Sequence, residues 1–167
     1  MEKDIRPKLQ LEKTKIEKSL DLICAIIFLA NLVYLLAEWS HIPSQVPTHF
    51  NALGEADAWG NKGSLLILPF ISVILWGGLH ALERYPHSFN YLIQITPENA
   101  ERQYKNARLM LNLMKNQMVL LFIYISYASI QVAKGESSGL GVWGLPVSLV
   151  VIFGTIIIFS IRSFRLK

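Results

Sequence analysis

Histidines and acids in one polar stretch are of the types that bind divalent cations. The stretch HIPSQVPTHFNALGEADAWGNK, residues 41–62, contains His49 and Asp57, eight positions apart. His41 and Glu55 lie in the same stretch. Imidazole and carboxylate groups are common ligands, but this set matches no ligand spacing of a known metal site. We therefore predict no metal and no cofactor, and His49 and Asp57 would be the first ligands to consider if a metal were bound.

A second pair of side chains has the chemistry to hold and move a proton. His80 and Glu83 are three positions apart, so both lie on one helical face, and Trp76 lies one turn before His80. An imidazole beside a carboxylate can accept and return a proton. The alternative is an ordinary group of polar side chains that reach the membrane surface, since Arg84 follows directly.

Polar residues also form two stripes with identical spacing inside apolar segments. Their members, at steps of seven, three and four, are Cys24, Asn31, Tyr34 and Glu38 in one segment and Gln117, Tyr124, Tyr127 and Gln131 in the other. These steps keep each set on one helical face. Because a polar group facing lipid is costly, we expect the stripes to face each other. They either bond to each other or line a wet cavity beneath residues 41–62.

The composition is that of a membrane protein. Of the 167 residues, 52% are hydrophobic and only 17% are charged, and the mean hydropathy is +0.37. Four apolar runs are long enough to cross, or nearly cross, a hydrocarbon layer of roughly 30 Å. They cover residues 19–39, 64–83, 118–133 and 143–161. We predict an all-α bundle of four transmembrane helices in a single domain, residues 19–161, between basic tails at 1–18 and 162–167.

Basic residues predict the orientation of this bundle. The two tails and the connection at 84–117 carry 14 of the 16 Lys and Arg residues, whereas Lys62 and Lys134 are alone in the two other loops. Because Lys and Arg are enriched in cytoplasmic loops, both termini and the 84–117 connection should be cytoplasmic. The motif loop at 40–63 then faces outward. The basic residues gather at membrane ends, which favours membrane lipids over nucleic acid as their partner.

The cytoplasmic connection contains a helix-start pattern. Thr96, Pro97 and Glu98 supply an N-cap, a proline at the first helical position and an acid near the positive end of the helix dipole. We predict that the third helix starts there and extends into the cytoplasm as one rod of roughly 35 residues. Its cytoplasmic half has two interpretations, a docking surface for a soluble regulator or ordinary packing against helices and lipid.

The outer loop is predicted to be a rigid lid. Pro43 and Pro47 favour extended chain, and Gly54 permits a reversal. We expect His49, Asn51 and Asp57 to form one hydrogen-bonded cluster over the outer helix ends, because a neutral imidazole can bridge an amide and a carboxylate. Trp59 should lie at the membrane interface.

The loop carries a resemblance to a known family. PSQVPTHFNALGEADAWGNKGS resembles the P-x-x-[IV]-P-x-H-F-[ND]-x-x-G-x-x-D-x-[WF]-G-x-K signature of a bacterial membrane-domain family that includes the SdpI-type toxin immunity and signalling proteins. The matching positions are Pro43, Pro47, His49, Phe50, Asn51, Gly54, Asp57, Trp59, Gly60 and Lys62. The resemblance covers roughly the first half of the chain. It implies a multi-pass protein of the bacterial cytoplasmic membrane, with the outer motif as its ligand-binding or lid site. SdpI-type members continue into further helices, whereas four spans are predicted here.

These observations favour a non-enzymatic role in envelope sensing or toxin immunity. The expected partners are an extracellular peptide or toxin, or a lipid-linked ligand, outside and a regulator in the cytoplasm. The polar cavity would involve Asn31, Tyr34, Glu38, Tyr124, Tyr127 and Gln131. The alternative is a metal-dependent membrane enzyme or a proton- or ion-coupled transporter that uses His49, Asp57, His80 and Glu83.

Overall fold

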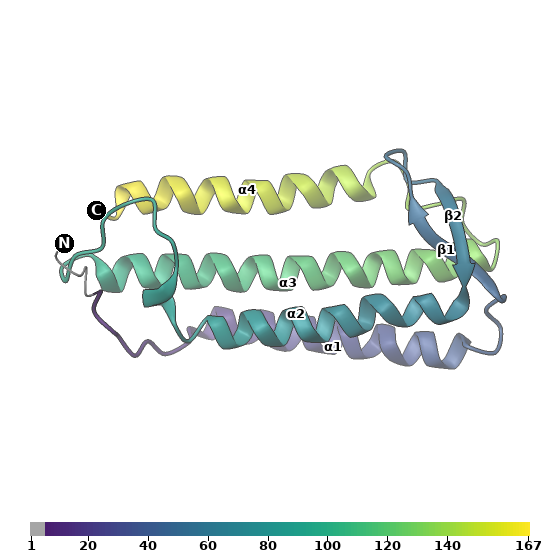
Figure 1. Ribbon diagram of the computed structural model, residues 1–167, viewed down its shortest axis with the longest axis horizontal. Helices are drawn as coiled ribbons and strands as arrows, with labels where there is room; N and C mark the ends of the chain where they lie inside the picture. The colour runs from purple at the N-terminus through teal and green to yellow at the C-terminus, as the bar shows by residue number, and fades with distance from the viewer. Residues whose placement is uncertain (1–5) are drawn as a thin grey trace.

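The computed structural model describes residues 6–167 as a long bundle with a small sheet at one end (Figure 1). Residues 1–5 of the predicted basic tail, Lys3 among them, lie outside the described residues. The elements in chain order are α1 (Lys15–Glu38), β1 (Gln45–Phe50), β2 (Ala56–Asn61), η1 (Lys62–Leu66), α2 (Ile67–Leu82), η2 (Pro86–Ser88), α3 (Ala100–Ala133) and α4 (Gly144–Arg165).

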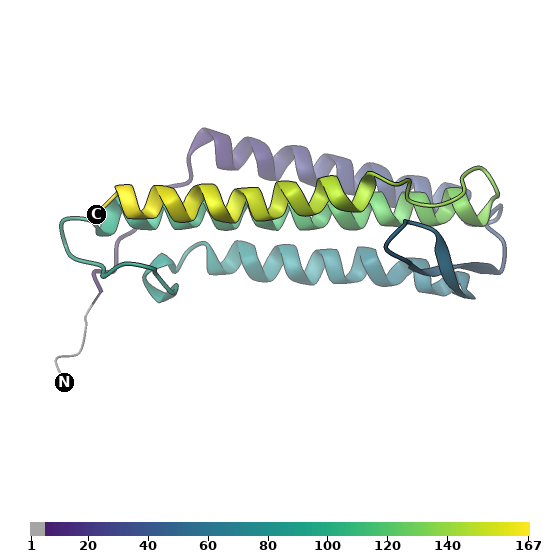
Figure 2. The same ribbon diagram turned by 90° about the horizontal axis from the view of Figure 1, so that it is seen from above.

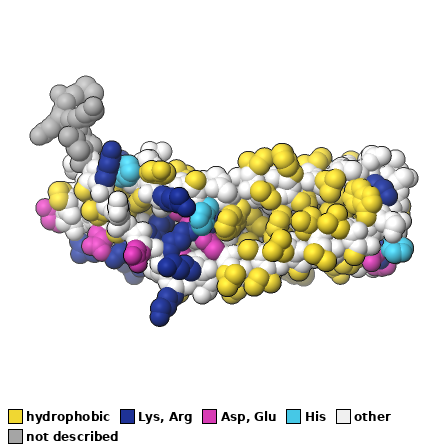
Figure 3. All heavy atoms as spheres, turned by 90° about the horizontal axis from the view of Figure 1, so that it is seen from below, with side chains coloured by type: hydrophobic (Ala, Val, Ile, Leu, Met, Phe, Trp, Pro, Cys, Tyr) yellow, Lys and Arg dark blue, Asp and Glu magenta, His cyan; other side chains and the backbone are white. Residues whose placement is uncertain are grey.

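Four helical segments are long and apolar enough to cross a membrane. They are Lys15–Glu38, Lys62–Leu82, Ala100–Ala133 and Gly144–Arg165. The prediction of a largely all-α bundle with four spans is confirmed, and the chain has the architecture of a multi-pass membrane protein. Figure 3 shows the corresponding belt of apolar side chains, with charged side chains gathered beyond it at the end where the described chain begins.

The exception to the all-α prediction lies in the loop expected at 40–63. Here β1 and β2 pair as an antiparallel hairpin, with Pro47 opposite Trp59 and Phe50 opposite Ala56. Gly54 has a φ of +80°, which the reversal requires and which glycine adopts without steric cost. Pro47 is tolerated because each strand of a two-stranded sheet is an edge strand. We had expected extended chain and a turn here, but not the strand pairing.

Local hydrogen bonds explain where two of the helices begin. Thr14 and Glu17 form a capping box at the start of α1, four residues before the predicted span. The predicted start of α3 at Thr96 is wrong, because α3 begins at Ala100. The Asn99 side chain accepts a bond from the Thr96 N–H at 3.0 Å and donates to Gln94 O, which holds a turn before the helix.

The helix α3 is the centre of the bundle. In Figures 1 and 2, α1, α2 and α4 lie around it on different sides, and each packs against it. Gln117 donates to Thr155 and Asn106 donates to Phe159 O, so α4 is fastened to α3 by polar contacts. The remaining surface of α4 is apolar and exposed, as at Val150, which is 72% exposed. Such a surface is suited to lipid.

Polar pairs join α1 to α3 along most of their length. The pairs are Glu17–Arg108, Asp21–Asn112, Asn31–Ser126, Tyr34–Gln131 and Glu38–Lys134, with sequence separations between 91 and 97. A nearly constant separation means that the two helices run parallel and in register. We call this set of contacts the α1–α3 seam.

The two ends of the bundle differ in composition. Both termini of the described chain and the α2–α3 connection lie at one end, and the hairpin and the α3–α4 loop lie at the other (Figure 1). The described basic residues of the two tails and of the 84–117 connection therefore belong to one end of the fold. That this end faces the cytoplasm stays a prediction from the charge distribution.

The buried pair Arg108–Glu17 gives a test of the seam. Arg108 is 2% exposed, donates to both oxygens of Glu17 at 2.9 and 3.1 Å, and also donates to Leu11 O and Glu12 O. Arg108→Met leaves the Glu17 carboxylate buried without its counter-charge, so the free energy of unfolding in mild detergent should fall by about 3–5 kcal/mol.

The double variant Glu17→Met/Arg108→Met should recover part of this loss, because it leaves no unpaired charge. Lys105→Met is the control, since Lys105 forms an exposed ion pair with Glu101 and its loss should change little. A double variant no more stable than Arg108→Met would contradict the electrostatic explanation.

Candidate functional sites

Polar chemistry is concentrated at the two ends of the bundle. Following the predicted orientation, we call the hairpin with the cavity beneath it the outer site. The inner site, which we call the charge cluster, consists of Lys13, Asp21, His80, Glu83 and Lys115.

In the hairpin, two of the predicted site residues meet. His49 Nδ1 lies 2.5 Å from Asp57 Oδ1, and the two side chains are 67% and 44% exposed. Both side chains of the pair are therefore open to water. A carboxylate at this distance fixes the orientation of the imidazole ring.

Asn51 belongs to a different contact. Its Oδ1 accepts from Leu53 N and Glu55 N at 2.9 and 3.0 Å, and its Nδ2 donates to Glu55 Oε2. This is the side-chain turn typical of Asn. The single cluster expected of His49, Asn51 and Asp57 is therefore divided into an exposed pair and a turn-holding amide.

The hairpin is fastened to the bundle at its base and at its tip. At the base, Val46 is buried against Leu35, Leu65 and Ile130. At the tip, Leu140 N donates to Gly54 O at 2.8 Å, and Glu55 pairs with Gly139 as a β-bridge. The hairpin thus closes over the ends of α1 and α3, as a lid would.

The remaining motif residues have structural or surface positions. Pro47 and Gly54 are buried, Phe50 is half-buried, and Pro43 is exposed. Lys62 donates to Trp39 O at 3.2 Å and lies over the Trp39 ring. Trp59 is 51% exposed.

A cavity of about 380 Å³ lies under the hairpin. Its lining is Pro47, Thr48, His49, Phe50, Ser64, Leu65, Ile67, Leu68, Ile125, Ser126, Ser129, Leu140 and Leu145. The walls are mostly apolar, with a few hydroxyls from α3 and an imidazole at the hairpin. This combination can hold an apolar group and hydrogen-bond a polar one. We call it the hairpin cavity.

The two polar stripes do not line this cavity. Tyr34 donates to Gln131 at 2.8 Å and its ring lies 5.5 Å from that of Tyr127. Asn31 and Glu38 pair with Ser126 and Lys134 in the α1–α3 seam, whereas the Tyr124 hydroxyl donates to Leu140 O. The six predicted cavity residues therefore form interhelical and loop contacts, and Ser126 and Ser129 supply the hydroxyls instead.

The charge cluster joins four segments of the chain at the opposite end. Lys115 is fully buried and lies 2.9 Å from Asp21 Oδ1 and 2.7 Å from Glu83 Oε1. Lys13, from the segment before α1, pairs with Asp21 at 2.8 Å and also with Glu83. Asn112 and Asn116 donate to Asp21 from α3. Two carboxylates are thus neutralised by two ammonium groups.

His80 completes the cluster. Its Nδ1 lies 3.2 Å from Lys13 Nζ, 3.5 Å from Lys115 Nζ and 3.5 Å from Asp21 Oδ2. In the tautomer that carries the ring proton on Nε2, Nδ1 accepts from the two ammonium groups. The ring stacks on Trp76 with centroids 4.8 Å apart. The predicted pair His80–Glu83 is brought together only loosely, with His80 Nδ1 3.9 Å from Glu83 Oε2. The Glu83 carboxylate forms its closer ion pairs with the two lysines.

The cluster also contains a possible metal-ligand set. One oxygen or nitrogen from each of Asp21, His80 and Glu83 lies within 4.8 Å of the others, the one such group in the described chain. It does not include His49 or Asp57. A cation there would have to displace the ammonium groups of Lys13 and Lys115, so the donor set is better suited to its own lysines.

Reasoning from the sequence missed Lys13, Asp21, Asn112, Lys115 and Asn116. A signal was present, because Glu17 and Asp21 extend the Cys24 stripe backwards by steps of three and four. Arg108, Asn112 and Lys115 repeat those steps in α3. For that part of α3 we had predicted either a docking surface for a soluble regulator or ordinary packing against helices and lipid.

Comparisons with known proteins cover part of the chain. Residues 26–73 match the family described as a domain of unknown function, DUF1648. They take in much of α1, the hairpin and the start of α2. An uncharacterized protein of Archaeoglobus fulgidus is 38% identical over 66 residues, which cover 35% of this chain and 36% of the relative. The match thus spans about a third of that relative's length. No solved structure matches the chain. These similarities support a membrane-protein family of unknown function.

Closure of the hairpin can be tested at Gly139. A Cβ there would lie 2.2 Å from Gly54 O, so Gly139→Ala must separate the loop from the hairpin tip. The reporter is Ser129→Cys, introduced together with Cys24→Ser. Its reaction with a thiol reagent should be about tenfold faster in Gly139→Ala for each 1.4 kcal/mol by which the free energy of hairpin closure is reduced.

Ser129 is suitable as the reporter because it is 4% exposed and lines the hairpin cavity. Ser138→Ala, in the same loop, is the matched control and should leave the rate unchanged. Equal rates with and without Gly139→Ala would show that the tip contact does not close the cavity.

The charge cluster predicts a pH dependence of stability through Lys13. Burial alone would lower the pKa of Lys13, but hydrogen bonds to Asp21 and Glu83 outweigh it and raise the pKa above 10.5. A raised pKa stabilises the fold fully below 10.5, and this stability is lost as pH rises through the folded-state pKa. The difference in melting temperature between the wild type and Lys13→Met should therefore narrow above pH 10.5. A difference that stays constant there would argue against an ionised Lys13 in the cluster.

Proposed function

We propose that this protein is a non-enzymatic sensor of the cell envelope. In this proposal the hairpin cavity binds an extracellular peptide or a lipid-linked ligand, and α3 relays binding to a soluble regulator in the cytoplasm. Toxin immunity combined with signalling, as in SdpI-type proteins, is the specific form that the motif of the hairpin favours. The membrane would be the bacterial cytoplasmic membrane.

The observation that carries the proposal is the hairpin cavity. Its volume of about 380 Å³ is within the range of small-ligand sites, and Leu65, Ile125 and Leu145 supply apolar walls. Ser126 and Ser129 add hydroxyls. Such a site fits an apolar side chain or acyl segment that carries a polar group, which is the chemistry of a hydrophobic peptide or of a lipid-linked molecule.

The position of the cavity supports the same ligand class. It lies between the outer ends of the spanning helices and the hairpin, so a ligand could enter from the outer aqueous phase or from the outer leaflet. His49 is 67% exposed, and a side chain so open to water is better suited to contacting a ligand than to water-excluding catalysis.

The relay part of the proposal rests on α3. This helix packs against β1 at the outer end and contributes Arg108, Asn112 and Lys115 to polar contacts at the inner end. Both sites therefore share one rigid element of 34 residues. A change in the hairpin that shifts α3 would alter the surface presented to a cytoplasmic regulator.

Photo-crosslinking in intact bacteria tests the ligand site. A crosslinking amino acid at Phe50, which lines the hairpin cavity, should capture a peptide or lipid-linked species of the envelope, and Ser129→Phe should abolish the capture by filling the cavity. The matched control is the same amino acid at Val150 on the exposed face of α4. Products at Phe50 identical to those at Val150 and unaffected by Ser129→Phe would reject the proposal.

A second candidate is a metal-dependent enzyme or a proton- or ion-coupled transporter. The observation in its favour is the set Asp21, His80 and Glu83, whose ligand atoms lie within 4.8 Å of one another. Metal analysis of protein purified without chelator separates the two functions. Stoichiometric zinc or another divalent ion, lost in His80→Ala but retained in His49→Ala, would favour this candidate. Metal-free protein would remove its main support.

A further inference from the structure

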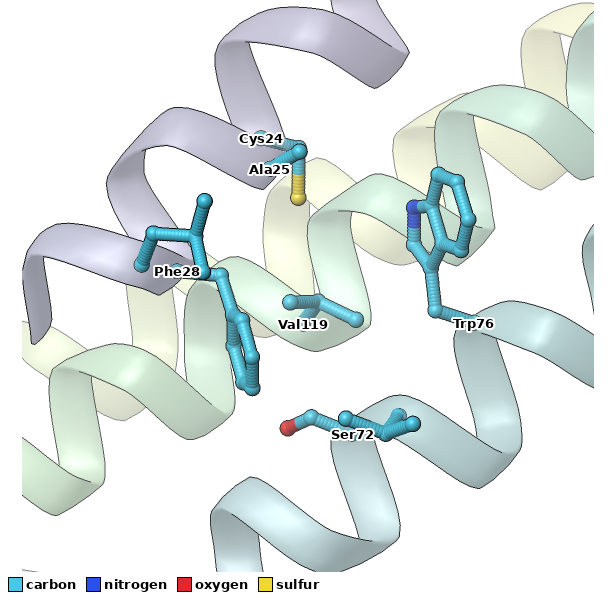
Figure 4. A pocket seen from close by; sticks show the side chains of 8 residues that line it. Cys24, Ala25, Phe28, Ser72, Trp76 and Val119 are labelled. Carbon is cyan, nitrogen blue, oxygen red and sulfur yellow. The ribbon is translucent and has the colours of Figure 1, made fainter. Parts of the chain in front are cut away.

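An apolar groove between α1 and α2 has no role in the function proposed above. It has a volume of about 210 Å³ and is lined by Cys24, Ala25, Phe28, Leu29, Ser72, Val73, Trp76 and Val119. Figure 4 shows Cys24 and Phe28 on one side, Ser72 and Trp76 on the other, and Val119 of α3 between them. We call it the α1–α2 groove.

The groove offers almost only apolar surface to a ligand. Ser72 Oγ donates to Leu68 O at 2.7 Å, and Trp76 Nε1 donates to Asn116 Oδ1 at 3.1 Å. The Cys24 thiol points to Asn116 O. Because these polar atoms already have protein partners, an occupant gains apolar contacts and few new hydrogen bonds. An alkyl chain meets this requirement better than a polar solute.

The inner end of the groove has the opposite character. His80 stacks on Trp76, which lines the groove, and its Nδ1 is occupied by the lysine ammonium groups. The Nε2–H is then the ring's remaining donor. The His80 side chain is 31% exposed, so a ligand can reach the ring.

Lys18 adds a positive charge at the same end. It precedes Ala25 by seven positions and Leu29 by eleven, so by helical periodicity it lies on the stripe of α1 that lines the groove. Lys18 is exposed and forms no ion pair with any residue of the described chain, 6–167. Asp21 and Glu83 are already neutralised by Lys13 and Lys115, which leaves Lys18 as a net charge.

We propose that the α1–α2 groove binds one anionic phospholipid of the inner leaflet. An acyl chain lies in the groove, and the phosphate accepts a hydrogen bond from His80 Nε2 and pairs with Lys18. The groove lies between two candidate membrane-spanning helices, so membrane lipids have direct access to it. In Figure 3 a histidine and basic side chains lie directly beside the apolar belt.

Native mass spectrometry with two lipid probes tests this assignment. Protein in mild detergent is mixed with equal amounts of phosphatidylglycerol and phosphatidylcholine that carry the same acyl chains. Wild type should retain the anionic lipid with about a fivefold preference, which corresponds to the roughly 1 kcal/mol that one basic side chain contributes near anionic lipid. Lys18→Gln should remove this preference, whereas Lys167→Gln, the same charge loss at the end of α4, should not.

A second pair of variants tests the acyl-chain part. Ala25→Leu fills the groove and should lower retention of both lipids, whereas Ala30→Leu, at an exposed position of the same helix, should leave retention unchanged. Equal retention of the two lipids by wild type would overturn the anionic assignment. Undiminished retention in Ala25→Leu would overturn the site. A dimer that Ala25→Leu dissociates would assign the groove to a second copy of the chain instead.

Discussion

The hydrocarbon core of a membrane contains no water to bond polar groups, so each polar side chain in the bundle needs a protein partner. In this fold α3 supplies most of them. It pairs with α1 along the α1–α3 seam, with α2 through Trp76 and Lys115, and with α4 through Gln117 and Asn106. The arrangement around one central helix follows from this requirement, because each neighbour must present its polar groups to α3 and its apolar face to lipid.

The parts of the fold that depend on local sequence could be predicted. Hydropathy over some 20 residues is enough to identify a span, so all four spans were found. Helix starts depend on single side chains. In α3 the Asn99 side chain accepts from Thr96 N–H and holds a turn, so the helix begins at Ala100 and not at the pattern around Thr96. The hairpin was missed because proline and glycine indicate extended chain and reversal, whereas pairing of β1 with β2 depends on the core formed by Val46 and Ile130.

The charge cluster could not be predicted for a different reason. Apart from Lys13 and Asp21, which are eight positions apart, its members come from segments about 30 to 100 positions apart. Their meeting depends on the register of α1 against α3 and α2. From a single sequence, Lys115 is predicted to be solvated or to face lipid, although here it is fully buried. Matching the acids of α1 to the bases of α3 at a constant separation would have revealed the register. The two predicted polar stripes indicate this register only for the half of the bundle near the hairpin.

The two ends of α3 are stabilised in different ways, and this bears on how the protein could respond to a ligand. At the inner end, buried ion pairs hold Lys13, α1 and α2 to α3, and breaking one leaves an uncompensated charge, which makes this end resistant to small displacements. At the outer end, the hairpin is held by one backbone bond at Gly54, a β-bridge and a small apolar core. The outer end is therefore the part that can open at low cost, whereas the inner end transmits a shift of α3 only as a unit.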